Sequence, residues 1–147
     1  MERQYKLLIV DDEQEIRDTY GNYFAKRGFI VDTAKDGIEG LDKLQHHEFD
    51  AALVDIKMPN MDGIEMMRQA LADEMVDASM IVLTGHGDRE EAVQTLNMGV
   101  DAWFDKSDDL ELSHLFKRVY ELAEVIPLDT VRHLLTTAAR EEEEQMS

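Results

Sequence analysis

The residues of this sequence with the clearest chemical potential follow short apolar segments. Asp11 and Asp12 come after the first such segment, and Asp55 ends another. Thr84 lies at the end of a further segment, and Lys106 follows the last. Each has an ordinary explanation by itself, since an aspartate after a strand often caps a helix and a single lysine is usually a surface residue. Their shared position at the ends of segments indicates a function.

These side chains suit phosphoryl transfer that depends on a divalent cation. Neighbouring carboxylates repel one another, and a bound cation relieves that repulsion. Because the available ligands are oxygen atoms, the expected cation is Mg²⁺. The cation and an ammonium group would neutralise phosphoryl oxygens, and a hydroxyl would donate a hydrogen bond to them. A carboxylate oxygen would attack phosphorus and form an acyl phosphate.

Composition limits the other classes of function. The chain has 147 residues, enough for one domain, and no cysteine, which excludes a thiolate nucleophile and suits a reducing cytoplasm. Its net charge of −18 opposes binding to nucleic acid or to anionic membranes. No apolar run is long enough for a membrane span, so a cytoplasmic location is predicted. No glycine-rich nucleotide motif is present, so the phosphoryl group is expected to come from another molecule.

Alternating strands and helices would place the candidate residues at one edge of a sheet. Apolar runs predict buried strands over 6–10, 29–34, 51–55, 79–83 and 100–104. Amphipathic segments predict helices over about 13–27, about 36–47, after the loop 58–63, over about 89–98 and over about 110–125. In the third helix, Ile64, Met67 and Leu71 are expected to face the core. This order predicts an open, doubly wound parallel sheet, in which ligands bind at the carboxyl ends of the strands.

The quoted motifs resemble the receiver domain of bacterial two-component response regulators. The matching segments are 8–13, 55–63, 82–85 and Lys106, within a resemblance that covers about residues 5–125. The predicted fold is therefore α/β: a doubly wound five-stranded parallel sheet of flavodoxin-like order 2-1-3-4-5, with five flanking helices and a C-terminal helical extension. The predicted domains are a receiver over 5–126 and an extension or linker with an acidic tail over 127–147.

The resemblance implies roles for the acidic residues and the segment after Asp55. Asp55 is the expected phosphoacceptor and also a Mg²⁺ ligand. Asp12 is expected to bind Mg²⁺ directly, and Asp11 mainly through water. The backbone carbonyl of Lys57 is the expected third protein ligand. Lys57 and His86, each two residues after a site residue, are expected to tune the lifetime of the phosphoryl group.

The resemblance also implies a switch. Thr84 is the expected switch hydroxyl, Lys106 is expected to pair with phosphoryl oxygens, and Trp103 lies where the family places a rotating aromatic side chain. A phosphoryl group adds about −1.5 to −2 units of charge. That charge would draw Thr84 inward and shift an equilibrium between two states. The surface expected to change covers the fourth helix, fifth strand and fifth helix, roughly residues 89–125.

Two positions depart from the family pattern. Ser107 follows the lysine where the family usually has proline, so the bond between Lys106 and Ser107 is expected to be trans. Gly85 follows Thr84 where the family often has alanine, which predicts a more mobile switch loop.

The resemblance implies a signalling domain, not an enzyme, with a sensor histidine kinase, a phosphotransfer protein or a small phosphodonor as the phosphoryl source. Its output is open between docking of a partner and control of a missing domain, with a slight preference for the second. A homodimer through the switch surface also remains open. Two other interpretations are a receiver that is never phosphorylated and an aspartate-nucleophile phosphatase. The phosphatase class favours a second aspartate where this chain has Lys57.

Overall fold

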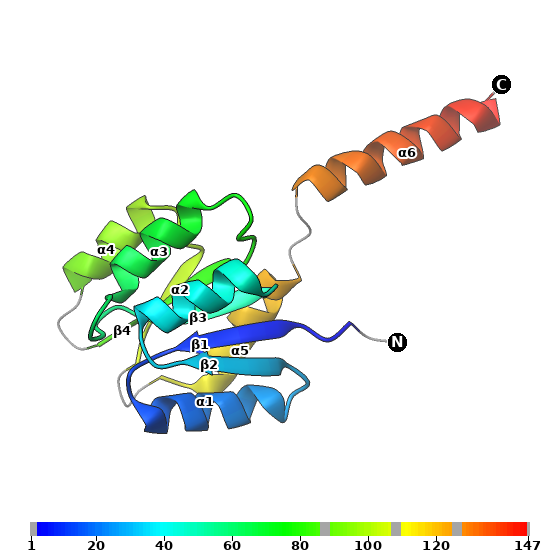
Figure 1. Cartoon of the computed structure of the whole chain (residues 1–147). Coiled ribbons are helices and arrows are strands. Elements are labelled where there is room, and N and C mark those ends of the chain that lie inside the picture. The colour runs from blue at the N-terminus through cyan, green and yellow to red at the C-terminus, as the bar shows by residue number, and fades with distance from the viewer. Residues whose placement is uncertain (1–2, 86–88, 107–109, 125–127, 147) are drawn as a thin grey trace.

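Five parallel strands form the centre of the structure, a computed structural model that describes residues 3–85, 89–106, 110–124 and 128–146 (Figure 1). The strand order is β2-β1-β3-β4-β5, so the predicted flavodoxin-like order is confirmed. Among the described residues, the elements in chain order are β1 Lys6–Val10, α1 Gln14–Ala25, β2 Ile30–Ala34, α2 Gly37–His46, β3 Ala51–Asp55, α3 Gly63–Ala72, β4 Ser79–Thr84, α4 Arg89–Asn97, β5 Ala102–Asp105, α5 Leu112–Ala123 and α6 Leu128–Met146.

The burial of each strand follows its place in the sheet. The central strands β1, β3 and β4 are buried along almost their whole length, as their continuous apolar sequences require. The edge strands β2 and β5 are less buried and alternate between more and less exposed residues, and each has a neighbouring strand on one side only. The parallel register pairs Val10 with Val54 and Asp55 with Leu83, which brings the carboxyl ends of β1, β3 and β4 to one edge.

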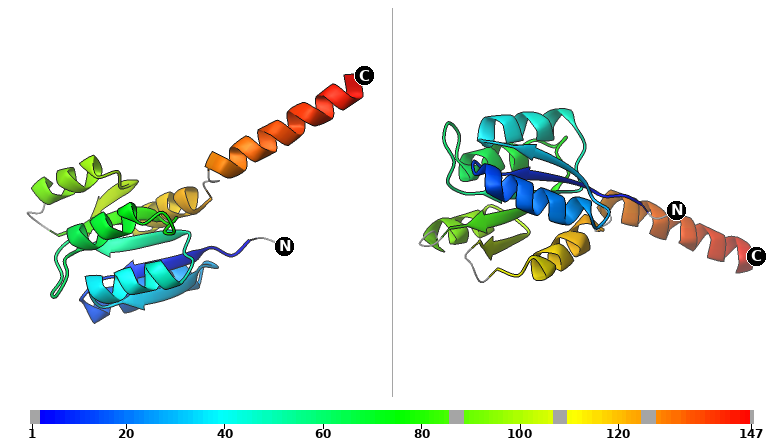
Figure 2. Two further views of the ribbon diagram at one scale, coloured as in Figure 1. Left: turned by 45° about the horizontal axis from the view of Figure 1, so that its top comes forward. Right: turned by 90° about the horizontal axis from the view of Figure 1, so that it is seen from below.

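Helices cover both faces of the sheet (Figures 1 and 2). On one face, α2 and α3 pack over an aliphatic and methionine core; on the other, α1 and α5 pack over a core rich in aromatic rings. Phe24 lies at the centre of the aromatic core, with its ring centroid 5.4 Å from that of Phe29 and 5.7 Å from that of Phe116.

One inward-facing residue of α3 was predicted wrongly. Met67 is buried and Ile64 is partly buried, as expected, but Leu71 is 39% exposed. Met66 and Ala70 are buried in its place. The buried stripe of α3 therefore turns through Met66, Met67 and Ala70, so that the helix packs its methionines, not its last leucine, against the sheet.

Beyond α5, the chain forms α6, which extends away from the sheet (Figures 1 and 2). The predicted extension is therefore helical over 128–146, while the division into a receiver over 5–126 and an extension over 127–147 stays a prediction. In the described part of the chain, no helix combines the length and the apolar character needed to cross a bilayer.

The aromatic core yields a test of the fold. We expect Phe24→Ala to lower the free energy of unfolding by about 3–5 kcal/mol, because the fully buried ring leaves a cavity between α1 and α5. Leu71→Ala is the matched control, and its cost should stay below about 1 kcal/mol because that side chain is partly exposed. Urea unfolding followed by circular dichroism measures both. Equal losses would contradict this assignment of the core.

Candidate functional site

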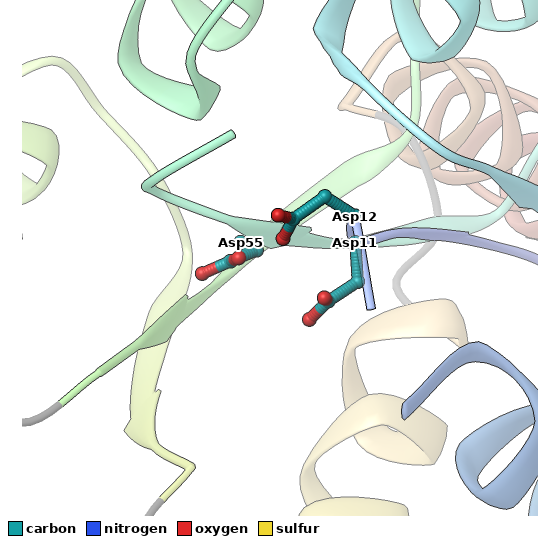
Figure 3. Close-up of side chains that lie close together, drawn as sticks. All are labelled: Asp11, Asp12 and Asp55. Atoms are coloured by element: carbon teal, nitrogen blue, oxygen red, sulfur yellow. The ribbon is translucent and has the colours of Figure 1, made fainter. Parts of the chain in front are cut away.

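Three aspartates meet at the carboxyl edge of the sheet. Asp11 and Asp12 follow β1, and Asp55 is the last residue of β3, the strand beside it. One carboxylate oxygen from each residue lies within 4.8 Å of the other two (Figure 3). Asp11 and Asp55 are buried, at 0% and 3% exposure, whereas Asp12 is exposed. The three acids that follow or end strands in the sequence therefore lie together in the structure.

Lys106 supplies a positive charge to this cluster. Its Nζ lies 3.1 Å from Oδ2 of Asp11 and 3.1 Å from Oδ2 of Asp55, and the side chain is only 12% exposed. The backbone N–H of Lys106 donates to the carbonyl of Thr84 at 2.9 Å, which extends the pairing of β4 with β5 by one residue. This backbone bond fixes the point from which the lysine reaches across the edge.

Two contacts that the sequence did not predict hold Asp11 in place. Its Oδ1 accepts a hydrogen bond from the backbone N–H of Glu13 at 2.9 Å. The guanidinium of Arg17 donates to its backbone carbonyl at 2.8 Å, from the first turns of α1. Glu13 also places Oε1 3.6 Å from the ammonium of Lys106. The sequence does contain an arginine six residues after Asp11. Its bond to the carbonyl of Asp11 could not be predicted, because it depends on the path of the chain between β1 and α1.

The segment after Asp55 turns back sharply into α3. The backbone N–H of Gly63 donates to the carbonyl of Ile56 at 2.7 Å. A Cβ at Gly63 would lie 2.1 Å from the carbonyl oxygen of Asp55, so this close approach requires glycine. Lys57 lies in this segment with an exposed side chain, two residues from Asp55.

The residues predicted to form the switch lie on the neighbouring strands. Thr84 is buried, and its hydroxyl donates to the carbonyl of Phe104 at 3.3 Å, toward β5. Trp103 lies on β5 and is 42% exposed. His86 and Ser107 lie outside the described residues, and so does the predicted trans bond between Lys106 and Ser107.

Burial and charge shift the proton affinities of the cluster. Burial, together with the nearby charge of Asp11, raises the pKa of Asp55 to about 7. Burial also raises the pKa of Asp11, although the Glu13 N–H bond and Lys106 oppose it. Burial acts to lower the pKa of Lys106, but Asp11 and Asp55 outweigh that effect and raise it. The site therefore holds a permanent ammonium beside carboxylates that are costly to ionise.

The donor atoms of the site fit a hard divalent cation. The three clustered carboxylates offer oxygen ligands only, and two of them are buried where a positive charge would offset their repulsion. Lys106 supplies one positive charge to two acids. Part of the negative charge of the cluster therefore stays uncompensated unless a cation binds. These residues are able to hold a metal ion.

Known proteins share both the sequence and the fold of this chain. A family model for the response regulator receiver domain matches residues 7–119. Response regulator MprA of Mycobacterium sp. (strain KMS) is 34% identical over 106 residues, which cover 72% of this chain and 46% of that protein. MprA of Mycobacterium tuberculosis (strain ATCC 25177 / H37Ra) gives the same identity and the same coverage. The chain thus spans about half the length of these relatives.

Solved structures agree with this match. A CheY-like response regulator receiver domain protein from Methanospirillum hungatei JF-1 has a TM-score of 0.76 and 31% identity, covering 83% of this chain and 95% of that one. The chemotaxis response regulator CheY4 of Vibrio cholerae has a TM-score of 0.73 and 27% identity, covering 82% of this chain and 99% of that one.

The raised pKa of Asp55 leads to a pH-dependent stability. Between pH 3.8 and about 7, folded Asp55 keeps a proton that the unfolded chain has lost. Its contribution to stability is therefore present at low pH and lost as the pH rises through this window. We expect Asp55→Asn, which stays neutral, to melt roughly 5 °C above wild type at pH 8 in EDTA. The gap should close toward pH 5.

Thermal melts of both proteins from pH 5 to 8 measure this difference. Asp77→Asn is a suitable control because it makes the same chemical change at an exposed acid outside the cluster, and its difference from wild type should not follow that of Asp55→Asn. A difference between Asp55→Asn and wild type that is constant across the range would contradict the prediction.

Proposed function

The chain belongs to the response regulator receiver domain family, and on this basis we propose that it accepts a phosphoryl group on Asp55. The observation that carries the proposal is the position of this carboxylate. Asp55 ends β3; one of its oxygens lies 3.1 Å from the ammonium of Lys106, and its carboxylate is clustered with those of Asp11 and Asp12. A nucleophile at this point has both a positive charge and potential cation ligands beside it.

The reaction forms one bond and breaks one. A carboxylate oxygen of Asp55 attacks phosphorus, the bond from phosphorus to the donor breaks, and its electron pair leaves with the donor. The product is an acyl phosphate. Because the pKa of Asp55 is about 7, a large share of the free protein holds a protonated and less nucleophilic carboxyl at neutral pH. Positive charge close to Asp55 favours the ionised form and so favours attack.

Mg²⁺ is the cation we propose for the site. Asp12 would bind it directly, Asp11 mainly through water, and Asp55 and the backbone carbonyl of Lys57 would complete the protein ligands. When bound, the ion neutralises charge that builds up on the phosphoryl oxygens. The geometric support is the cluster of Asp11, Asp12 and Asp55.

We propose that phosphorylation switches the molecule through Thr84 and Lys106. Lys106 already touches Asp55, so its ammonium is placed to pair with phosphoryl oxygens. Thr84 would exchange its bond to the carbonyl of Phe104 for one to the phosphoryl group. Trp103, on the same strand as Phe104, would rotate in response. The affected surface is α4, β5 and α5.

Exposed apolar side chains on that surface support a docking role. Val93 and Leu96 on α4 and Trp103 on β5 are 41–52% exposed. We propose that this surface controls a partner or an output domain, with self-association of two chains as a further use. The phosphoryl group would come from a sensor histidine kinase, a phosphotransfer protein or a small phosphodonor. The role is signalling, without nucleic acid as a direct partner.

Lys57 and His86 are proposed to tune the lifetime of the phosphoryl group. Lys57 has an exposed side chain in the segment that follows Asp55, where it can alter the path of an attacking water. His86 lies outside the described residues, so its role rests on its position two residues after Thr84.

Intact-mass spectrometry tests the proposed function. After incubation with Mg²⁺ and acetyl phosphate, wild type should gain the mass of one phosphoryl group, because Asp55 is the nucleophile. Asp55→Asn should gain none, and EDTA should abolish the gain in wild type. Asp77→Asn, a change at an exposed acid, should be modified as wild type is, which controls for the loss of an acid.

A different result would point to another function. If wild type gains no mass under conditions that modify a known receiver, the chain acts as an interaction module without phosphorylation. If the mass appears and acetyl phosphate is then consumed with rapid turnover, the aspartate-nucleophile phosphatase is favoured instead.

The proposed switch is tested by the fluorescence of Trp103, the one tryptophan in the chain. Phosphorylation should change the emission of wild type, because Thr84 leaves β5 and the indole moves. Thr84→Val keeps the shape of the side chain and removes the hydroxyl, so it should gain the same mass while losing most of the emission change. Full retention of the emission change in Thr84→Val would exclude Thr84 as the link.

A further inference from the structure

The segment between β3 and α3 is tied to the start of α2 by two hydrogen bonds. The side-chain amide of Asn60 donates from Nδ2 to Oδ2 of Asp36 at 3.0 Å. The backbone N–H of Gly37 donates to the carbonyl of Met61 at 3.1 Å. Asp36 and Gly37 are adjacent at the start of α2, and they bond two consecutive residues of the segment, Asn60 and Met61.

Asn60 adopts a conformation that needs support. Its φ is 66°, the one left-handed non-glycine residue in the described part of the chain. Asparagine tolerates this region better than most residues, yet the conformation still carries a cost. The bond to Asp36 is made by the side chain of this same residue, so it stabilises the unusual backbone at the point where the segment turns.

Asp36 serves two elements at once. Its Oδ1 accepts from the backbone N–H of Glu39 at 2.9 Å and so caps α2, while Oδ2 accepts from Asn60. The residue is 7% exposed. The Glu39 N–H bond, aided by Asn60, lowers the pKa of Asp36 despite its burial, so the carboxylate is ionised and its bond to Asn60 is charge-assisted.

Close packing at Gly37 reinforces the tie. A Cβ at Gly37 would lie 2.3 Å from the carbonyl oxygen of Met61, so a larger residue would push the segment away. At its far end the segment is fixed by the bond from Gly63 to Ile56 at 2.7 Å. The residues from 57 to 62 are therefore held at the middle and at both ends.

This segment begins with Lys57, whose carbonyl is proposed above as a cation ligand. We propose that Asp36 and Asn60 are positioning residues that hold the segment after Asp55 in the conformation that binds the cation. The inference rests on the proposed function. Neither residue touches the acidic cluster, and they act through the backbone between Lys57 and Asn60. Without their bond, the segment must be ordered when the cation binds, and that cost lowers the affinity.

Exchange of the bonding groups tests this inference. Asn60→Asp places two carboxylates against each other, and Mg²⁺ affinity should fall about tenfold, as is typical when a partner of a ligand is lost. The added negative charge alone would raise the affinity for a cation, so the direction of the change separates the two effects. The double variant Asp36→Asn with Asn60→Asp restores donor, acceptor and net charge, and retains a capping side chain on α2. It should bind Mg²⁺ as wild type does.

A second variant guards against misfolding of the first. Asn60→Gly accepts the positive φ and removes only the amide, so it should fold and still bind Mg²⁺ several-fold more weakly, on the scale of one lost charge-assisted bond. Hydrogen exchange of the Gly37 amide, measured without metal, should be faster in Asn60→Gly and Asn60→Asp. A purely structural role at the α2 cap would lower the melting temperature without changing the Mg²⁺ affinity.

The measurement is an NMR titration of each folded protein with MgCl₂, with thermal melts recorded alongside. Equal Mg²⁺ affinity in wild type, Asn60→Asp and Asn60→Gly would overturn the positioning role and leave the proposed function standing. Absence of Mg²⁺ binding by wild type would overturn the proposed cation site and the positioning role with it. Failure of the double variant to recover would also count against the pair.

Discussion

The ammonium of Lys106, held between two buried carboxylates, is the interaction on which the site depends. Nζ lies 3.1 Å from an oxygen of Asp11 and 3.1 Å from an oxygen of Asp55. Burying two carboxylates side by side is unfavourable, and one lysine compensates for only part of their charge. The remaining negative charge, together with exposed Asp12, is what makes the site receptive to a divalent cation. The three charged groups come from β1, β3 and the end of β5, and only a parallel sheet brings those ends to one edge.

The same geometry connects Asp55, the proposed nucleophile, to the edge strand of the sheet. Lys106 donates its backbone N–H to Thr84, and the Thr84 hydroxyl donates to the carbonyl of Phe104. Asp55 and Leu83 are register partners, so Asp55 lies one residue from Thr84 across the sheet. A new charge on Asp55 therefore acts on groups that already bond to β5. These contacts link the neighbourhood of Asp55 to β5, the strand that carries the exposed Trp103.

The sequence predicted those parts of the fold that depend on burial. Strands β1 and β3 were placed at their observed bounds, because a continuous apolar run has few alternatives to a buried central strand. The edge strand β5 begins at Ala102, two residues later than predicted. The backbone N–H of Asp101 donates to the carbonyl of Met80, but the N–H of Met80 is taken by the side chain of Asp101 and not by its backbone. The inward orientation predicted for Leu71 was wrong because α3 contains several apolar residues, and only the packing against the sheet decides which of them face inward.

The site was predictable to the extent that it follows from strand ends. Asp11, Asp55 and Lys106 meet because the fold brings their strands together, and their residue types carry the chemistry. The contacts of Arg17 with Asp11 and of Asn60 with Asp36 were missed, since they join a side chain to a turn whose path is set by tertiary structure. The bond from the Thr84 hydroxyl to the carbonyl of Phe104 could not be predicted for the same reason, because the side-chain torsion that makes it depends on the surrounding structure.

The strong negative charge of the chain has a consequence for the proposed reaction. With a net charge of −18, the protein attracts cations to its surface and repels anionic phosphodonors. Lys106 is 12% exposed and already shared by two acids, so it offers an approaching phosphoryl group little uncompensated positive charge. In the proposed reaction, a bound cation would supply the neutralisation that both the approach of the donor and the transfer need. Local order in the segment after Asp55 would then contribute to both steps, because it would keep the proposed backbone ligand in place before a donor arrives.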